Sequence, residues 1–252
     1  MSTILQGKQI SKTFVQGGVR NQVLSNVDIE IFDGDFTVIM GASGAGKSTL
    51  LYALSGLDRI SGGSVWYREK EISALSEKDL SKLRAREFGF VFQQIHLVSS
   101  LSLRENVAVA GYVGRKGSTG EIRDRTEQLL DRMGVKEAAD RMPSQVSGGE
   151  AQRAAIARAM IGNPGILFAD EPTGALNKAN TTEVLQLLTE LNRLGQSSLM
   201  VTHDMRAAVR GSRLLYLEDG RVVDELTLDP YSESQEKERE DRVNTWLTGL
   251  HW

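Results

Sequence analysis

One stretch of this sequence constrains the fold more than any other. Residues 41–48 read Gly-Ala-Ser-Gly-Ala-Gly-Lys-Ser, which matches G-x-x-x-x-G-K-[ST], between an apolar run at 36–40 and a helix-like run at 49–54. Strand, glycine-rich loop and helix in that order form a P-loop, in which backbone N–H groups and the positive end of the helix face a phosphate. The sequence therefore predicts a nucleoside triphosphate site, with Lys47 on the β- and γ-phosphates and Ser48 on Mg²⁺.

The composition excludes several other chemistries. The chain has 252 residues, enough for one large domain or two subdomains. It has no cysteine and only 3 histidines, so disulfides, iron–sulfur clusters and thiolate or histidine metal cages are not expected. The net charge of −3 argues against a nucleic-acid partner. Since no apolar run approaches the ~20 residues of a membrane span, we expect a cytoplasmic chain that reaches a membrane only through a partner.

The order of predicted elements indicates an α/β fold with an insertion. Residues 4–15 and 23–32 alternate between apolar and polar on either side of a Gly17-Gly18 turn, in the manner of antiparallel strands. Residues 94–164 are mostly helical in pattern, with a glycine-containing loop at 114–120, and strands and helices alternate again from 165. This order predicts an α/β core, an antiparallel β subdomain and an inserted α-helical subdomain at about 94–164. We assign 1–228 to the nucleotide-binding domain and 229–252 to a charged tail with a short amphipathic helix.

A second phosphate-site element follows at Asp170 and Glu171. These two acids end the apolar run at 166–169. A strand-end carboxylate holds the Mg²⁺ shell in P-loop enzymes, which fits Asp170, and Glu171 is placed to accept a proton from the attacking water. The alternative is an ordinary solvated strand end, which the P-loop upstream makes a poor explanation.

The third informative feature is Ser147-Gly148-Gly149-Glu150 at the start of a predicted helix. Such a start is an anion-binding helix N-terminus. It is also a good capping box, with Ser147 as the N-cap and Glu150 at the third helical position, and the two interpretations are compatible. Because one triphosphate needs one such site, the second is expected to serve a nucleotide held by another copy.

With these residues the chain resembles the ATP-binding subunit of ABC transporters over about residues 3–227. The resemblance rests on the following elements, in this order: the P-loop at 41–48, Gln93 after an aromatic strand, the signature at 146–150, Asp170-Glu171, Ala175-Leu176, and His203 after a strand. The motifs at 90–94, 105–107, 169–174 and 201–204 resemble the subgroup of macrolide exporters, lipoprotein-releasing transporters and peptide-antibiotic detoxification transporters.

The resemblance implies a P-loop NTPase (RecA-like) core and two domains facing head to tail around two ATPs. It implies the following roles: Phe14 stacks on adenine; Gly41, Ser43, Gly44, Ala45, Gly46, Lys47, Ser48 and Thr49 cradle phosphates; Ser48, Gln93 and Asp170 hold Mg²⁺; Ser147, Gly148 and Gly149 contact the γ-phosphate in trans; Glu171, His203 and Gln93 are catalytic. An alternative for Phe14 is a half-buried strand aromatic, and for His203 a structural histidine.

The resemblance also implies a membrane partner. We expect an ATPase on the cytoplasmic face of the cell membrane, bound peripherally through a transmembrane permease. Apolar residues after Gln93 are expected to be exposed for that permease or to pack within the helical subdomain: Ile95, Leu97, Val98, Leu101 and Leu103. The expected role is export or resistance to antimicrobial peptides, with lipoprotein release and macrolide efflux as alternatives.

Two residues depart from the family pattern. Glu150 stands where the signature often has Gln, and we expect it to cap the helix with little loss of binding. Asn177 stands where Asp is usual, which puts the coupling of the two ATP sites in doubt. The tail helix, with Val243, Trp246 and Leu247 at helical spacing, is expected to dock on its own domain or on the second copy rather than to face the membrane.

Two other functions of P-loop proteins fit this sequence less well. A GTPase would use Asn177 to Asn180 to bind guanine, but Asn180 lacks the carboxylate of N-K-x-D. A DNA-repair or chromosomal ATPase of this family would carry a long coiled-coil insertion between the P-loop and the signature, for which this chain has too few residues.

Overall fold

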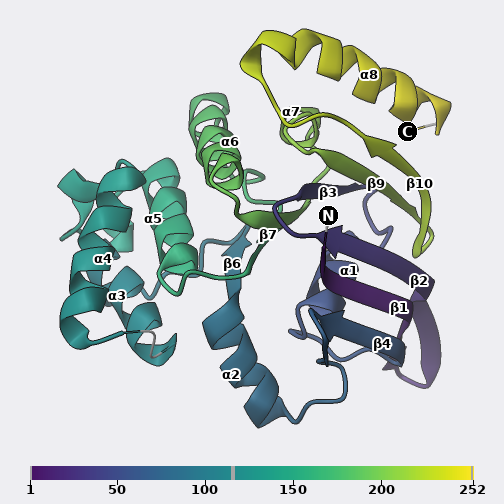
Figure 1. The fold of residues 1–252 in the computed structure, drawn as a ribbon, viewed down its shortest axis with the longest axis horizontal. Coiled ribbons are helices and arrows are strands. Elements are labelled where there is room, and N and C mark those ends of the chain that lie inside the picture. Colours follow the sequence, from purple (N-terminus) through teal and green to yellow (C-terminus); the bar gives the residue numbers. More distant parts are fainter. Residues whose placement is uncertain (1, 115–116, 251) are drawn as a thin grey trace. The chain divides into compact units, whose positions relative to one another are not determined.

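The computed structural model describes residues 2–114, 117–250 and 252, and its elements are labelled in Figure 1. The chain forms two compact units. Unit 1 comprises residues 1–76 and 192–252, and unit 2 comprises residues 77–191. Unit 2 is therefore inserted into unit 1, and the second boundary falls within helix α6 (Lys178–Arg193).

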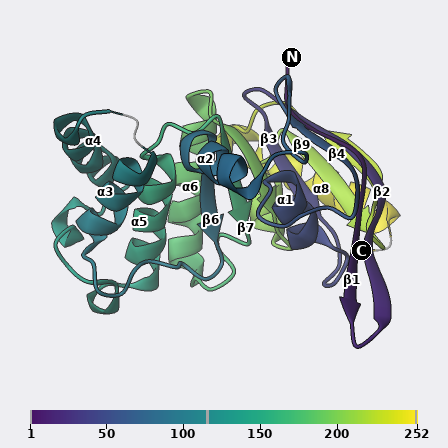
Figure 2. The same cartoon turned by 90° about the horizontal axis from the view of Figure 1, so that it is seen from below.

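Unit 1 contains a 4-stranded sheet in the order β2-β1-β4-β5. Its strands are β1 (Thr3–Gln16), β2 (Val19–Phe32), β4 (Gly62–Tyr67) and β5 (Lys70–Glu71), and the neighbours pair antiparallel. The β1–β2 hairpin turns at Gly17 and Gly18, which both have positive φ, and it extends as a long ribbon in Figure 2. Strand β2 starts before the alternating pattern does, because backbone pairing continues to the turn where the side chains are exposed.

The other strands of unit 1 follow the order β10-β9-β3-β8. They are β3 (Phe36–Met40), β8 (Ser197–Val201), β9 (Arg213–Glu218) and β10 (Arg221–Thr227). Every residue of β3 and β8 is buried, as is typical of parallel strands covered on both faces. Strand β3 pairs in parallel with both β8 and β9. Helix α1 (Lys47–Leu54) follows β3, and helix α7 (Met205–Ala208) follows β8.

The tail of the chain forms the short turn η3 (Glu233–Gln235) and helix α8 (Glu236–Gly249). Val243 and Leu247 are buried, and the indole N–H of Trp246 donates to Asp224 of β10 at 3.1 Å. Figure 1 shows α8 (yellow) along β9, β10 and α7 of the same unit. The tail therefore docks on its own unit.

Unit 2 combines two parallel strands with a group of helices. Its elements are α2 (Glu77–Glu87), β6 (Phe88–Phe92), α3 (Leu103–Gly114), α4 (Thr119–Arg132), η1 (Lys136–Ala138), η2 (Pro143–Gln145), α5 (Gly148–Met160), β7 (Ile166–Asp170) and most of α6. Helices α3, α4 and α5 pack side by side in both views (Figures 1 and 2). Between the strands, the rings of Phe90 and Phe168 stack with centroids 5.4 Å apart.

One local expectation needs correction, and one open alternative is settled. The loop expected at 114–120 is shorter, because Ser118 caps α4, which begins at Thr119; residues 115–116 lie outside the described residues. Of the apolar residues expected either to be exposed or to pack within the helical subdomain, Leu103 takes the second alternative and is fully buried. It opens α3, whose inner face packs on α5, while Val98 in the loop before it is 48% exposed.

Candidate nucleotide-binding site

The P-loop of unit 1 has a backbone that depends on its glycines. Gly41, Gly44 and Gly46 have φ of 147°, 85° and 101°, a region that other residues rarely adopt. A Cβ on Gly41 would lie 2.1 Å from the carbonyl oxygen of Leu217 in β9. The neighbouring strand therefore requires glycine at position 41, in addition to the conformation of the turn.

The N-terminus of α1 opens onto this loop. Gly46 is the N-cap, and within the described residues no side chain caps this end and no acidic residue lies in the first turn. The ammonium of Lys47 donates to the carbonyl oxygens of Gly41 at 2.8 Å and Ala42 at 2.9 Å, so it lies across the loop. A helix N-terminus with a lysine and no carboxylate in its first turn is suited to a phosphate.

Strand pairing brings His203 to the same end of the sheet as the P-loop. Ile39 pairs with Val201, and the N–H of Thr202 donates to the carbonyl of Ile39 at 3.1 Å. Because β3 and β8 run in parallel, the residues that follow them leave the sheet together. His203 is exposed there, and the next residue, Asp204, caps α7 through the N–H of Arg206.

Phe14 lies on β1 near the end of the hairpin. Its side chain is 43% exposed, which suits a ring that receives a ligand on one face. The ammonium of Lys12 lies over the ring, 4.7 Å from its centroid. The sequence motif did not suggest this contact.

Unit 2 brings together three of the predicted residues. Phe92 of β6 pairs with Asp170 of β7, so Gln93 and Glu171 follow paired positions of parallel strands. A Cβ on Gly174 would lie 2.9 Å from Nε2 of Gln93, which places the Gln93 amide against the turn that follows Glu171. Glu171 itself has φ of 45°, a conformation rarely seen outside glycine and characteristic of constrained functional positions.

The predicted signature forms the N-terminus of α5 as a complete capping box. Ser147 Oγ accepts from the N–H of Glu150 at 3.2 Å and donates to its carboxylate at 2.8 Å, and the carboxylate also accepts from the N–H of Ser147 at 2.8 Å. The backbone and hydroxyl donors of Ser147 hold the pKa of Glu150 below its ordinary value. Glu150 therefore turns back onto the cap, as expected from the sequence.

Gly149 of the signature is buried, and a Cβ there would lie 2.4 Å from Cγ of Asn180. Asn180 belongs to the first turn of α6, where its N–H donates to Oδ1 of Asn177 at 3.0 Å. These asparagines thus form a helix start packed against the signature.

Gln152 was missed by the sequence analysis. Its side chain is 1% exposed, and Nε2 donates to the carbonyls of Phe92 at 3.2 Å and Pro172 at 2.7 Å. It therefore ties the signature helix to the segments that carry Gln93 and Glu171. The available signal was a polar residue on an otherwise apolar helix face that includes Ala155 and Ile156.

The donor chemistry of the predicted metal ligands fits Mg²⁺. Across the described residues, no group of 3 or more His, Cys, Asp or Glu side chains could hold a metal ion by itself. Mg²⁺ rarely uses such all-protein cages and is usually held by one or two carboxylates together with substrate phosphates and water. A hydroxyl from Ser48, an amide from Gln93 and a carboxylate from Asp170 are oxygen donors of that kind.

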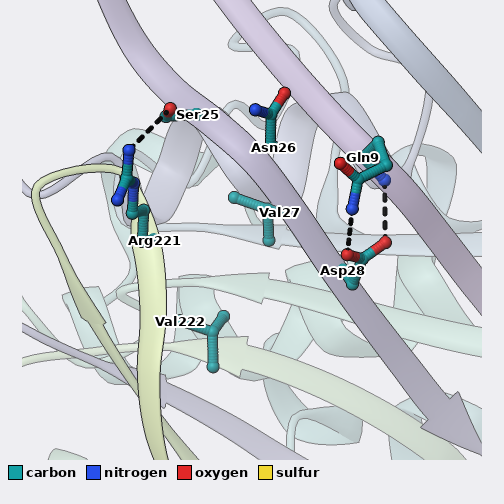
Figure 3. A pocket seen from close by; sticks show the side chains of 7 residues that line it. All are labelled: Gln9, Ser25, Asn26, Val27, Asp28, Arg221 and Val222. Carbon is teal, nitrogen blue, oxygen red and sulfur yellow. Dashed lines mark hydrogen bonds between the residues drawn. The ribbon is translucent and has the colours of Figure 1, made fainter.

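A separate surface hollow on unit 1 does not compete with this site (Figure 3). It is lined by Gln9, Ser25, Asn26, Val27, Asp28, Arg221 and Val222. Its carboxylate, Asp28, accepts hydrogen bonds from both the backbone and the side-chain amide of Gln9. Arg221 likewise donates to the hydroxyl of Ser25, so both charged side chains of the hollow already bond to lining residues.

Fold and site together define a P-loop nucleotide-binding protein with a second glycine-lined helix start. The sequence profile of the ABC transporter family matches residues 24–174, more than half of the chain. The chain therefore belongs to the ABC transporter family, as an ATP-binding cassette of the ATPase type. Within the described residues, no helix has the length and hydropathy that crossing a bilayer requires.

Individual relatives agree with this assignment. The macrolide export ATP-binding/permease protein MacB of Wolinella succinogenes is 42% identical over 219 residues, which are 87% of this chain and 34% of MacB. The chain thus spans about a third of the length of that relative. Two dimeric structures of the cassette MJ0796, one in a post-hydrolysis state with ADP and Pi and one described as a bacterial ABC transporter cassette, match with TM-scores of 0.83 and 38% identity, over 90% of this chain and 100% of theirs.

Proposed function

We propose that this chain binds ATP with Mg²⁺ at its P-loop and hydrolyses it as one of two copies arranged head to tail, and that the cycle drives a transmembrane permease. The observation that carries the proposal is the pair of glycine-lined helix starts. One is at α1, with Lys47 across the loop. The other is at α5, behind Ser147. A single triphosphate needs one phosphate-binding helix start, so the second is available to a nucleotide on another copy.

Substrate binding rests mainly on unit 1. The backbone amides of residues 41–49 and the ammonium of Lys47 hold the phosphates, and Phe14 stacks on adenine. Ser48, Gln93 and Asp170 hold Mg²⁺, which when bound neutralises charge on the phosphate oxygens. The glycine-dependent backbone of the P-loop is already turned for this role, which lowers the cost of binding because little of the loop has to reorganise.

Hydrolysis relies on groups at strand ends. The carboxylate of Glu171 accepts a proton from the water whose oxygen attacks the γ-phosphorus. The bond from that phosphorus to the bridging oxygen breaks, and ADP and phosphate leave. Gln93 orients the water, and His203 contacts the γ-phosphate. The left-handed backbone of Glu171 and the packing of Gln93 against Gly174 support such fixed orientations.

The second copy supplies Ser147, Gly148 and Gly149 to the γ-phosphate. Support comes from the dimeric state of both matched MJ0796 structures and from the ADP and Pi in one of them. The packing of Gly149 on Asn180 gives the signature a rigid base. ATP then joins the two copies, and its hydrolysis releases them.

The permease assignment is supported by the name of MacB, which joins an ATP-binding part to a permease. Val98, with the half-buried Ile95, Leu97 and Leu101, offers an apolar surface after Gln93. We place the chain at the cytoplasmic face of the membrane, held there through the permease. The cargo we favour is exported, as in antimicrobial-peptide resistance. Lipoprotein release and macrolide efflux are the alternatives within the same subgroup.

The direct test is Glu171→Gln. Loss of the general base is expected to lower ATP hydrolysis by about 10²- to 10⁴-fold while ATP binding persists, so the variant should accumulate as an ATP-bound dimer. Turnover is measured by phosphate release and the dimer by light scattering after size exclusion. Glu137→Gln, an exposed carboxylate of unit 2, is the matched control and should behave as the unaltered chain.

Two outcomes would contradict the proposal. Normal turnover by the Glu171→Gln variant would remove Glu171 from the role of base. Full turnover by a strictly monomeric preparation, independent of protein concentration, would remove the second copy.

The permease is tested by fractionation, since membrane retention is expected only when the permease is co-expressed.

A further inference from the structure

A buried lysine lies directly behind the aromatic ring that we assign to adenine. Lys12 is 8% exposed, and its ammonium sits over the ring of Phe14, 4.7 Å from the centroid. A cation over a ring face interacts favourably with the π-electrons and covers that face. Phe14 is nevertheless 43% exposed, so the ring remains accessible from elsewhere.

Lys12 is anchored from the other side as well. Its ammonium pairs with the carboxylate of Asp58 at 2.7 Å and donates to the carbonyl of Arg59 at 2.6 Å. The carboxylate of Asp58 balances the charge of the ammonium. Lys12 therefore contributes mainly through the position of its side chain against the Phe14 ring. A buried ammonium held by a carboxylate and a carbonyl has little freedom to leave.

The same loop is joined to β1 by its backbone. The N–H of Ser61 donates to the carbonyl of Ser11 at 2.7 Å, and Ser61 Oγ accepts from the N–H of Thr13 at 3.0 Å. These bonds lie on either side of Lys12 in the sequence. Strand β1 is therefore attached to the loop at 58–61 by both its backbone and the Lys12 side chain.

This loop continues from the phosphate-binding helix. The N–H of Asp58 donates to the carbonyl of Tyr52 in α1 at 3.1 Å, and α1 begins with Lys47 and Ser48. A connected path thus runs from the phosphate end of α1, through the loop, to Lys12 and then to Phe14. All of it lies within unit 1.

The geometry points to Lys12 as a positioning residue for adenine recognition. Lys12 covers one face of the Phe14 ring and fixes the ring relative to α1. The opposite face of the ring is then presented to the purine. The inference rests on the proposed stacking of Phe14 on adenine and adds the residue that makes this stacking productive. Lys12 touches neither the phosphates nor the reacting atoms.

The test compares the affinity for a non-hydrolysable ATP analogue with that for inorganic tripolyphosphate, which lacks the base. Calorimetry on the full chain measures both. Phe14→Ala is expected to lower the affinity for the ATP analogue by about tenfold, because losing a base–aromatic stack usually costs this much. Lys12→Met, which keeps the volume and removes the anchor, should weaken it by about two- to fivefold. Neither should change tripolyphosphate binding.

Two further variants sharpen the result. Lys12→Arg keeps a cation that can pair with Asp58 and cover the ring, so it should restore most of the affinity for the analogue. Lys8→Met is the matched control. Lys8 lies on β1, as Lys12 does, and its ammonium is 5.7 Å from the ring centroid of Trp66 in β4. It should leave both affinities unchanged. The double variant of Phe14→Ala and Lys12→Met should bind no more weakly than Phe14→Ala alone.

The outcomes separate the inference from the function on which it rests. If Phe14→Ala binds the analogue normally, the adenine role of Phe14 fails, and that of Lys12 fails with it. If Phe14→Ala weakens the analogue but Lys12→Met does not, Phe14 keeps its role and the inference is overturned. An equal loss of affinity for the analogue and for tripolyphosphate in Lys12→Met would also overturn the inference. The lysine would then stabilise the domain as a whole and not the stacking of adenine.

Discussion

Nε of Arg239 donates a hydrogen bond to the backbone carbonyl of Val209 at 2.8 Å. The same guanidinium donates to the carbonyls of Gly211 at 2.6 Å and Asp229 at 2.5 Å, and it lies over the ring of Tyr231. Arg239 is only 3% exposed. One side chain of α8 thus satisfies carbonyls from the segment after α7 and from the start of the tail.

Arg239→Ala is expected to destabilise the chain. It leaves buried carbonyls without their donor and removes the buried stem, which together cost about 2–4 kcal/mol of the free energy of unfolding. Urea unfolding followed by circular dichroism measures this. Lys237→Ala, at an exposed position of the same helix, should change the free energy of unfolding by no more than about 0.5 kcal/mol. Equal midpoints for the two variants would show that α8 is not held by Arg239.

Lys47→Ala tests the P-loop. The loss of a charged donor to the phosphates should lower the affinity for ATP by about tenfold to a hundredfold. Titration with the ATP analogue measures the effect, and Lys70→Ala, an exposed lysine of unit 1, serves as control. Unchanged ATP affinity of the Lys47→Ala variant would refute the assignment of the loop.

Asn177→Asp tests the proposed coupling of the ATP sites of two copies. Asn177 caps α6 through its Oδ1, and an aspartate oxygen can make the same bond, so the fold should be kept. The added charge is expected to raise the Hill coefficient of ATP hydrolysis toward about two, the limit for two coupled sites. A Hill coefficient equal to that of the unaltered chain would count against an interface role for this residue.

Glu150 gives the signature helix a dependence on pH. Because donors from Ser147 hold its pKa below the ordinary 4.5, the ionised cap stabilises the folded chain fully above that ordinary value. The contribution is lost as the pH falls through the lowered pKa.

Glu150→Gln checks this contribution. A glutamine can still complete the capping box, so near neutral pH the loss should be about 0.5 kcal/mol or less after solvent screening. The difference in unfolding free energy between the variant and the unaltered chain should shrink in acid. A difference that stays constant through the acid range would show that the carboxylate charge does not contribute.

Local motifs were predictable because their chemistry is local. Glycines that reach positive φ, a serine cap followed three residues later by a carboxylate, and acids at the end of an apolar strand are each determined by a few adjacent residues. The positions of Gly41, Ser147 and Asp170 within their elements follow from such patterns. The ABC transporter assignment follows from their order along the chain.

The sequence by itself determined the local motifs from which we predict phosphate binding, and the tertiary structure decided which groups meet. The pairing of β3 with β8, which places His203 beside the P-loop strand, joins residues more than 150 positions apart, and periodicity does not specify a strand's neighbours. Which surfaces pack together also decides three other features: the burial of Leu103, the contact of Lys12 with Phe14, and the buried position of Arg239. Long-range packing selects one arrangement among many that share the same local patterns, because the free energy of burial depends on the whole fold.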